Sequence, residues 1–376
     1  MIVVIGAGLI GLAIAYELAL RGAEVRVVDA GEPARAASWA GAGMLAPFTE
    51  TIDAPAYEAL CADSLARYPA FVRGLFERAG VDAHLRLHGI IEAAFAPADA
   101  ARLRERAVAL AARGIRARFL DAAAARAAEP ALGAGVAGAL LSETEGCVDN
   151  RRLGRALRAA CAALDVRIDE HAGRVAVEAD ARRVLGVRVP DGFLPATQVV
   201  NAAGAWAGEL PGVPEHAAVP VVPVKGEMLA LAMTGPFVRR TVWVPGAYLV
   251  PRDDGRLLIG ATVERAGFDV RVTAGGVRAL LDAAIGAMPA LAGFAVAETW
   301  AGLRPGSHDG LPYLGETDVA GYFVAAGHYR NGILLTPATA VALADTLAGT
   351  PAPGLEAFSP RRVRQSAAAG AGKGAA

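Results

Sequence analysis

The chain opens with a strand-like run that is followed by a glycine-rich turn. The run from Ile2 to Ile5 is apolar and β-branched, which is typical of a buried strand. A segment with apolar residues on most of its faces comes next and ends near Gly22, so we expect a buried helix. Glu24 to Val28 predicts a second strand, which finishes on Asp29. The pattern therefore predicts a strand–helix–strand unit at the N-terminus.

Further along the chain, segments of helical and of strand-like periodicity are separated by turn residues, and no internal repeat is apparent. Helical periodicity covers Ala98 to Arg113 and Asn150 to Ala163. Strand-like patterns cover His84 to Phe95, Pro220 to Leu231, Tyr248 to Val250 and Leu257 to Val263. This mixture predicts a fold of the α/β class.

Composition limits the size and the partners of the protein. The 376 residues are 54% hydrophobic, enough for about two domains or one large α/β domain. The 37 Lys and Arg residues against 38 Asp and Glu residues leave a net charge of -1. Such a balance provides no basic surface for nucleic acid or for a membrane.

The cysteines and the composition of the two chain ends indicate the expected cellular location of the protein. Cys61, Cys147 and Cys161 are too scattered for a disulfide framework or a zinc site. The uncharged start, Met1 to Tyr16, is shorter than the roughly 20 residues that span a bilayer. The Ala- and Gly-rich end, 366–376, is expected to be a disordered tail. We therefore expect a cytoplasmic protein with no metal and no membrane contact.

Three glycines follow the first predicted strand at an informative spacing. Gly6, Gly8 and Gly11 form a G-x-G-x-x-G motif. In such a motif the first glycine permits a tight turn, the second lets a pyrophosphate approach the backbone, and the third lets the helix pack on the strand. Asp29 lies about 20 residues further on, where a carboxylate can accept hydrogen bonds from a ribose. We interpret the unit as a dinucleotide site, with a purely structural turn as the alternative, and the motif does not separate NAD from FAD.

The segment after Asp29 separates these two cofactors. An NAD enzyme ordinarily continues with another strand and helix, whereas Ala36 to Pro47 predicts a loop of small residues that can lie against a ligand. Its ASWAGAGML stretch and the GAGLIG turn resemble the D-amino-acid oxidase superfamily of FAD enzymes, and the glycine oxidases of thiamine biosynthesis most closely. Three further stretches carry this resemblance, which spans residues 1 to about 347: Val199–Leu210, Trp300–Gly315 and Ala325–Thr339.

The resemblance implies which residues contact the cofactor. Some relatives attach FAD covalently through a histidine or a late cysteine, but this chain has Ala40 at the first position and no cysteine after Cys161, so we expect non-covalent FAD. The N-terminal contacts are expected from Gly6, Gly8, Leu9, Ile10, Gly11, Asp29, Ala30, Ala37, Ser38, Ala42, Gly43 and Met44. The later contacts are expected from Arg174, Val175, Ala203, Gly204, Trp206, His328, Tyr329, Arg330, Asn331, Gly332, Ile333 and Leu334. Trp206 would pack near the flavin, and His328 to Gly332 would open the last long helix and point its N–H groups at the flavin.

The resemblance also implies two domains. A Rossmann-like FAD-binding domain would be discontinuous, built from 1–80, 145–215 and 300–360. The segments between them, 81–144 and 216–299, would form a substrate-binding α+β domain around an antiparallel sheet.

Arg304, in GLRPG, is the first candidate for the chemistry. A planar guanidinium can hold a carboxylate in one pose through two parallel hydrogen bonds. The residues alone leave open an ordinary ion pair, for example with Asp309, whereas the resemblance implies the carboxylate role. Lys225, in VKGE, could be a catalytic amine, but we expect a structural residue that points to the surface from a strand end.

Tyr248, in GAYLVPR, is the second catalytic candidate. Its counterpart in glycine oxidases donates a phenolic hydrogen bond to the same carboxylate, and the alternative is a half-buried tyrosine on a sheet face. Val263 stands where these relatives carry a methionine. We expect this difference to change the volume of the substrate pocket, which leaves strict glycine preference open.

The activity implied by the resemblance is oxidative deamination of glycine to an imine, which hydrolyses to glyoxylate and ammonia while oxygen becomes hydrogen peroxide. No general base is needed if the substrate binds as the neutral amine. The alternatives are a sarcosine or D-amino-acid oxidase or dehydrogenase, and a non-catalytic flavoprotein of the same fold. The expected partners are a small amino acid, oxygen and further copies of the chain in a homo-oligomer, without nucleic acid.

Overall fold

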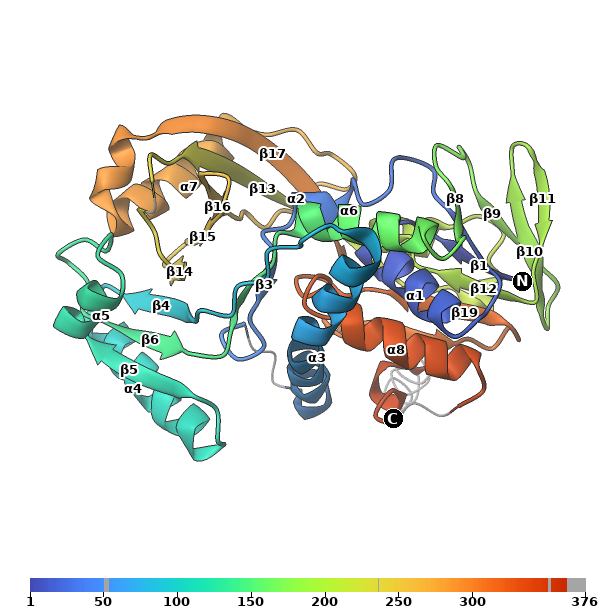
Figure 1. Ribbon diagram of the computed structural model, residues 1–376, viewed down its shortest axis with the longest axis horizontal. Coiled ribbons are helices and arrows are strands. Elements are labelled where there is room, and N and C mark those ends of the chain that lie inside the picture. The colour runs from blue at the N-terminus through green and yellow to red at the C-terminus, as the bar shows by residue number, and fades with distance from the viewer. Residues whose placement is uncertain (51–53, 236, 351–352, 364–376) are drawn as a thin grey trace, which may run out of the picture.

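Two large β-sheets, one toward each end of an elongated molecule, organise the computed structural model (Figure 1). The structure describes residues 1–50, 54–235, 237–350 and 353–363. The tail expected at 366–376 lies outside these described residues. Within them, no helix is both long enough and apolar enough to cross a membrane.

The first sheet has six strands and contains the predicted N-terminal unit. Its order is β18 (Tyr313–Glu316), β19 (Tyr322–Ala326), β12 (Gln198–Asn201), β1 (Ile2–Ile5), β2 (Val25–Val28) and β8 (Arg167–Asp169). Neighbouring strands run parallel, except that β18 is antiparallel to β19. Helix α1 (Leu9–Leu20) connects β1 to β2. The strand–helix–strand prediction is thus confirmed, with the strand from the far end of the chain, β19, in the same sheet.

Helices cover one face of this sheet, and a small antiparallel sheet covers the other face. The helices α1, α3 (Pro55–Ala79), α6 (Asn150–Ala162) and α8 (Thr336–Leu347) share a hydrophobic core with Val4, Val27 and Val200 of the sheet. Val3, Val28 and Val199 point the other way. They pack against β9 (Ala176–Ala179), β10 (Val184–Val189) and β11 (Gly192–Pro195). Because α1 lies between the sheet, α6 and α8, it is apolar on nearly every face.

The second sheet has eight strands and is mostly antiparallel. Its order is β17 (Ala295–Gly306), β13 (Val222–Ala232), β16 (Arg256–Gly260), β15 (Ala247–Pro251), β14 (Thr241–Val244), β4 (Ile90–Ala94), β6 (Gly138–Ser142) and β5 (Ala117–Asp121). Among the pairs of these described strands, β14 with β4 is the parallel one. The helices at this end are α4 (Pro97–Ala112), α5 (Ala122–Ala128) and α7 (Ala274–Ala287).

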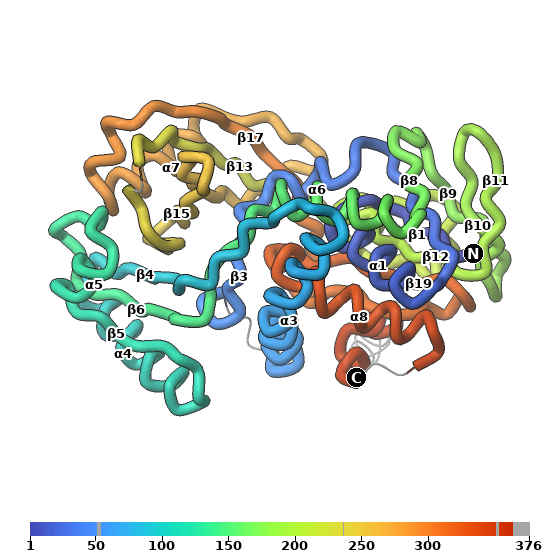
Figure 2. Tube along the Cα trace, viewed as in Figure 1, coloured from blue at the N-terminus to red at the C-terminus, as the bar shows by residue number. Residues whose placement is uncertain are grey.

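Strand β13 shows how this second sheet separates its two faces. Leu229 and Leu231 point into a core shared with α7, whereas Met228 and Ala230 point to the opposite face. Figure 2 shows β13 and β17 running side by side from the region of α7 toward the middle of the molecule. The expected domain boundary at residue 300 falls inside β17, and the division into two domains remains a prediction.

Several short elements complete the fold. They are α2 (Ala37–Ala40), β3 (Met44–Leu45) paired with β7 (Gly146–Cys147), and the 3-10 turns Gly204–Glu209, Glu215–Ala217, Pro289–Gly293 and Glu356–Phe358. The segment Ala36 to Pro47 is therefore not a plain loop, because it contains α2 and β3. Cys61, Cys147 and Cys161 are buried and free.

The strand predicted from His84 to Phe95 is only partly correct. Strand β4 begins at Ile90. His84 and Gly89 have φ angles of 50° and 87°, a left-handed conformation that no regular strand contains. The alternating pattern before Ile90 therefore produces a single isolated bridge, between Arg86 and Cys147.

Candidate active site

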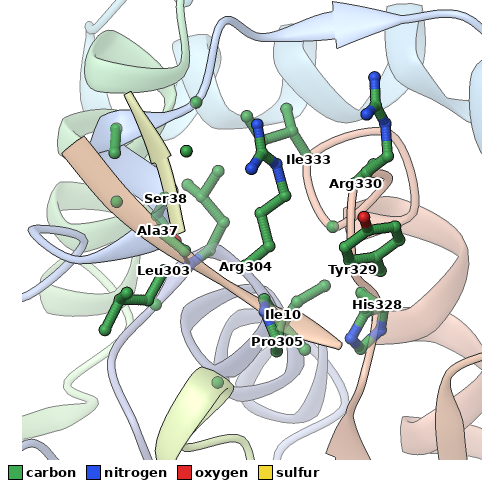
Figure 3. Close-up of a pocket in the computed structure, with 18 of the residues that line it drawn as sticks. Ile10, Ala37, Ser38, Leu303, Arg304, Pro305, His328, Tyr329, Arg330 and Ile333 are labelled. Carbon is green, nitrogen blue, oxygen red and sulfur yellow. Dashed lines mark hydrogen bonds between the residues drawn. The ribbon is translucent and has the colours of Figure 1, made fainter. Parts of the chain in front are cut away.

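A cavity opens where the two sheets meet (Figure 3). The first sheet contributes the segments that follow the carboxyl ends of β1, β12 and β19, and the second contributes parts of β13, β15 and β17. The remaining walls come from α2 and from the residues that follow it. In open parallel sheets, ligands bind beyond the carboxyl ends of the strands, so the cavity lies where a cofactor site is expected.

Backbone packing closes the glycine-rich turn at two of its glycines, and the third borders the cavity. A Cβ atom at Gly6 would lie 2.4 Å from the carbonyl oxygen of Ala202, and one at Gly11 would lie 1.9 Å from the carbonyl oxygen of Gly6. Gly8 lines the cavity, and a Cβ atom there would have Ser38 Oγ as its nearest non-neighbouring atom, at 3.3 Å. Gly8 therefore borders the cavity with bare backbone, where a pyrophosphate would approach it.

Polar groups around this turn suit a dinucleotide. Gly8, the N-cap residue of α1, has no side chain to cap the helix, so the first turn of α1 places a positive helix terminus beside the cavity. Ser38 Oγ accepts a hydrogen bond from the Leu9 N–H at 2.9 Å. The Asp29 carboxylate accepts from the N–H groups of Ala7 at 2.6 Å and Gly31 at 2.8 Å, which fixes it at the end of β2. These groups fit the phosphates and the ribose of FAD.

Side chains from three other parts of the chain hold the α2 segment against the cavity. Asn150 Nδ2 donates to the carbonyl oxygen of Ser38 at 2.8 Å. Trp300 Nε1 donates to the Ala40 carbonyl at 2.9 Å, and Arg252 Nη2 donates to the Ala42 carbonyl at 2.9 Å. Each of these donors satisfies a backbone acceptor that would otherwise be buried without a partner. The segment is therefore a fixed wall whose small residues leave room for a ligand.

Arg304 reaches the cavity from β17 (Figure 3). Its Nη1 donates to the carbonyl oxygens of Lys225 at 3.3 Å and Thr262 at 3.2 Å. Within the part of the chain that the structure describes, no ion pair includes Arg304. Asp309, the alternative partner considered above, accepts instead from Arg362 Nε at 2.8 Å. The guanidinium is thus available for an anion in the cavity.

Tyr248 lies in the same cavity on β15 and is almost fully buried. Its hydroxyl group is 3.4 Å from Met228 Sδ. Burial raises the pKa of Tyr248, and the nearby charge of Arg304 only partly opposes this rise. The phenol therefore keeps its proton at neutral pH and can donate a hydrogen bond.

The loop that follows β19 forms the opposite wall, but it does not open the last helix. Helix α8 starts at Thr336, with Pro337 in its first turn, so the prediction that His328 to Gly332 begin this helix is wrong. Gly327 and Tyr329 have φ angles of 78° and 48°, which a right-handed helix cannot contain. His328, Tyr329, Arg330, Gly332 and Ile333 therefore line the cavity from this loop and not from the start of α8.

Two charged or titratable side chains of this loop have partners. Arg330 forms an ion pair with Glu50, another residue of the cavity wall. His328 Nε2 lies 3.1 Å from Thr339 Oγ1. Burial lowers the pKa of His328 to about 3, so its imidazole is neutral.

The structure brings together many of the residues predicted from the sequence. Those that line the cavity are Gly8, Leu9, Ile10, Ala37, Ser38, Ala42, Gly43, Met44, Gly204, Tyr248, Arg304, His328, Tyr329, Arg330, Gly332 and Ile333. Those outside its lining are Gly6, Gly11, Asp29, Ala30, Arg174, Val175, Ala203, Trp206, Asn331 and Leu334. Trp206 is 45% exposed and stacks on Phe268, and Asn331 Nδ2 donates to the hydroxyl group of Tyr57 at 3.1 Å. Contact with the cofactor remains a prediction for both sets.

Sequence reasoning missed other parts of the cavity wall, among them Glu50, Gly226, Met228 and Gly302. Gly226 had a usable signal, because a glycine inside a strand pattern often marks a close approach. A Cβ atom there would lie 2.2 Å from Arg304 Nη1. Glu50 and Met228 occupy ordinary positions in their segments, and only the folded chain brings them to the cavity.

Comparisons with known proteins agree with this geometry. The family described as "DAO: FAD dependent oxidoreductase" matches residues 1–346. The chain belongs to this family. Glycine oxidase from Pseudomonas putida is 38% identical over 355 residues, which cover 93% of this chain and 94% of that protein. The crystal structure of glycine oxidase from Geobacillus kaustophilus matches with a TM-score of 0.91 and 36% identity, covering 96% of this chain and 98% of that chain. The bifunctional protein ThiO/ThiG of Synechocystis sp. is 38% identical over 371 residues, 96% of this chain but 54% of that protein.

As a member of the FAD-dependent oxidoreductase family, the chain uses FAD, and the cavity fits this cofactor. The open turn at Gly8 and the start of α1 would hold the pyrophosphate, and Asp29 would hold the ribose. The α2 segment and the loop after β19 would enclose the flavin from two sides. When bound, FAD supplies the acceptor for the two electrons that leave the substrate.

The first prediction concerns how FAD is attached. The described lining of the cavity contains no cysteine. Its one histidine, His328, forms a hydrogen bond with the hydroxyl group of Thr339. We therefore expect the purified protein to be yellow and to release intact FAD into the supernatant on heat or acid denaturation. Chromatography of the supernatant measures this release, and flavin that stays with the precipitated polypeptide would contradict the prediction.

Proposed function

We propose that this FAD-dependent amino-acid oxidase acts on glycine. The observation that carries the proposal is Arg304, a guanidinium without an ion-pair partner among the described residues, placed in the same cavity as the Tyr248 phenol. A guanidinium and a phenol can both donate to one carboxylate. The similarity to glycine oxidases from two bacteria supports the same substrate.

In this proposal the protein's own residues bind and orient the amino acid. Arg304 holds the substrate carboxylate through two parallel hydrogen bonds, and Tyr248 adds a third donor. Met228, Leu303 and Ile333 give the cavity apolar walls that exclude water from the reacting carbon. Tyr248 and Met228 also line the cavity with bulky side chains, which supports a small substrate.

The titratable groups of the cavity favour a substrate that binds as the neutral amine. Glu50 is paired with Arg330, the His328 imidazole has a low pKa, and Tyr248 keeps its proton. None of these three is poised to remove a proton near neutral pH. The lone pair of an unprotonated amine then assists the departure of the electrons from the α-carbon.

The overall reaction balances with oxygen and water as co-substrates. Glycine loses two electrons and two protons to become the imine, and oxygen gains them to become hydrogen peroxide. The imine then takes up water and yields glyoxylate and ammonia.

Val263 stands at the position where the related glycine oxidases carry a methionine. Its side chain is 54% exposed and does not belong to the cavity lining. The expectation that this difference from the family's methionine changes the volume of the substrate pocket stays a prediction. Sarcosine and small D-amino acids are the competing substrates to be compared with glycine.

The second prediction tests this function. Under anaerobic conditions, glycine is expected to bleach the flavin absorbance of the protein, because electrons leave the substrate and cannot pass to oxygen. In air, glycine should yield glyoxylate, ammonia and hydrogen peroxide in equal amounts, and hydrogen peroxide, which every substrate would produce, is measured by a coupled assay to compare glycine with sarcosine and D-alanine. A flavin that no amino acid of the panel bleaches would indicate a non-catalytic flavoprotein, and faster bleaching by sarcosine or D-alanine would replace glycine as the substrate.

We also propose a role in thiamine biosynthesis, which the similarity to the bifunctional protein ThiO/ThiG supports. A cytoplasmic location and a homo-oligomeric assembly remain predictions from the sequence.

A further inference from the structure

Lys225 is buried behind Arg304, although the sequence suggested a lysine that points to the surface. It lies within β13 and is 2% exposed. Its backbone carbonyl oxygen accepts a hydrogen bond from Arg304 Nη1. A buried ammonium is costly unless it is paired, so its partners determine what the residue does.

Two carboxylates surround the Lys225 ammonium. Its Nζ donates to Glu227 Oε1 at 2.7 Å and to Glu264 Oε2 at 3.2 Å. Glu227 is 0% exposed, and its carboxylate also accepts from the Thr273 N–H at the start of α7. The hydrogen bond to Glu227 raises the pKa of Lys225. Burial by itself would raise the pKa of Glu227, but the hydrogen bonds from Lys225 and from the Thr273 N–H outweigh burial and lower this pKa. Both residues of the pair stay charged.

Thr262 supplies the second carbonyl oxygen that accepts from Arg304. Its hydroxyl group contacts the backbone of Glu227 and the carboxylate of Glu264. Its Oγ1 accepts from the Glu227 N–H at 2.9 Å and donates to Glu264 Oε1 at 2.5 Å. The backbone groups of Glu264 and Lys225 exchange hydrogen bonds of 2.9 Å and 3.0 Å. The residues whose carbonyls contact the guanidinium, Lys225 and Thr262, are therefore the same residues whose side chains are fixed by Glu227 and Glu264.

The Arg304 guanidinium packs closely against the backbone of β13, so it has little freedom to move on that side. Gly226 lies between Lys225 and Glu227, and a Cβ atom there would overlap the guanidinium. The Arg304 side chain thus crosses the backbone of β13 at its one position without a side chain. A small shift of the carbonyls of Lys225 or Thr262 would rotate the guanidinium and change the direction of its free N–H groups.

We propose that Lys225, Glu227, Thr262 and Glu264, here named the Lys225 network, position the Arg304 guanidinium for the substrate carboxylate. The proposal rests on the proposed function, in which Arg304 binds that carboxylate. The four residues are positioning residues, because the described contacts connect them to Arg304 and none of the four lines the cavity. The network acts by fixing two acceptors on the far side of the guanidinium, so that its other donors keep the geometry that a carboxylate requires.

Glu264→Gln is the main test, because the Glu264 side chain is 35% exposed and the variant should fold. The amide keeps the size of the side chain but removes one charge from the network. We expect the KM for glycine to rise about tenfold with kcat changed less than about twofold. A small misplacement of the Arg304 guanidinium would weaken its hydrogen bonds to the substrate carboxylate. The dissociation constant of acetate, which carries the carboxylate without the amine, should rise by the same factor. Anaerobic titration of the flavin absorbance measures acetate binding.

Thr262→Val provides a second variant, because it keeps the carbonyl and the shape of the side chain but removes both Oγ1 hydrogen bonds. It should give the same pattern of raised KM and weakened acetate binding. Asp282→Asn is the matched control: it neutralises an exposed carboxylate on α7 that pairs with Arg278, and it should leave KM and acetate binding unchanged. FAD content should equal that of the parent in all three variants.

The outcomes separate this proposal from a purely structural role. Lower melting temperatures with an unchanged KM and unchanged acetate affinity in both network variants would overturn it. A fall in kcat or in FAD content without weaker acetate binding would also overturn it, because it would place the network's effect on the flavin. If Arg304→Lys itself leaves acetate binding unchanged, the assignment of Arg304 fails and the proposal falls with it. If Arg304→Lys weakens acetate binding and the network variants do not, only the network is excluded.

Discussion

Replacing Arg304 with lysine is expected to raise the KM for glycine markedly, and replacing it with alanine should raise it further. Lysine keeps the positive charge but loses the planar fork that gives two parallel hydrogen bonds. Alanine leaves the carboxylate in the cavity with Tyr248 as its remaining assigned donor. For Arg304→Ala we expect a loss of about 2 to 5 kcal/mol, roughly 30-fold to several thousand-fold in kcat/KM.

The measurement compares glycine with a small amine that lacks a carboxylate, such as methylamine, in the parent and in both variants. If the enzyme oxidises that amine, the rate should be much less affected, since Arg304 has nothing to bind in it. Arg271→Lys serves as the control, because Arg271 is exposed and pairs with Asp269. Equal losses on both amines, or loss of FAD from the Arg304 variants, would show that Arg304 serves the flavin or the fold instead.

Gly8→Val is expected to prevent FAD binding while the polypeptide still folds. The backbone of Gly8 is extended, with φ of -69° and ψ of 176°, a conformation that valine adopts readily. The new branched side chain would project into the space assigned to the pyrophosphate. We expect FAD to bind at least about 100-fold more weakly, which corresponds to about 2.7 kcal/mol.

The ratio of flavin absorbance to protein absorbance, and titration of the apoprotein with FAD, measure this effect. Circular dichroism should show that the variant keeps its secondary structure. Gly11→Ala is the contrasting variant, because its Cβ atom would lie 1.9 Å from the carbonyl oxygen of Gly6 and should disturb the packing of α1 on β1. Normal FAD affinity in Gly8→Val would mean that the phosphates lie elsewhere.

The part of the site that follows a local rule could be predicted from the sequence. The glycine spacing, the apolar run before it and Asp29 after it depend on residues close together in the chain, and the structure forms that unit as expected. The placement of Arg304 and Tyr248 in one cavity is different, because they lie on strands that are not neighbours in the sheet. Their common site followed from the family resemblance and not from periodicity.

Other features depend on tertiary contacts that no local pattern encodes. Lys225 reads as an exposed strand end, yet Glu227, Glu264 and the Thr273 N–H allow it to be buried. The expectation that His328 to Gly332 open α8 rests on the family resemblance, and it fails because the left-handed backbone at Gly327 and Tyr329 keeps these residues in a loop before Thr336. Neither the burial of Lys225 nor the loop before α8 follows from the local sequence pattern.

The burial of the three cysteines has a consequence for the durability of the enzyme. Hydrogen peroxide, the proposed product, reacts with the thiolate form of cysteine far more readily than with the thiol. Burial raises the pKa of Cys61 and Cys161 to about 12, and it also raises the pKa of Cys147. All three side chains therefore remain thiols beneath the surface of the folded protein, shielded from the hydrogen peroxide that the proposed reaction would release.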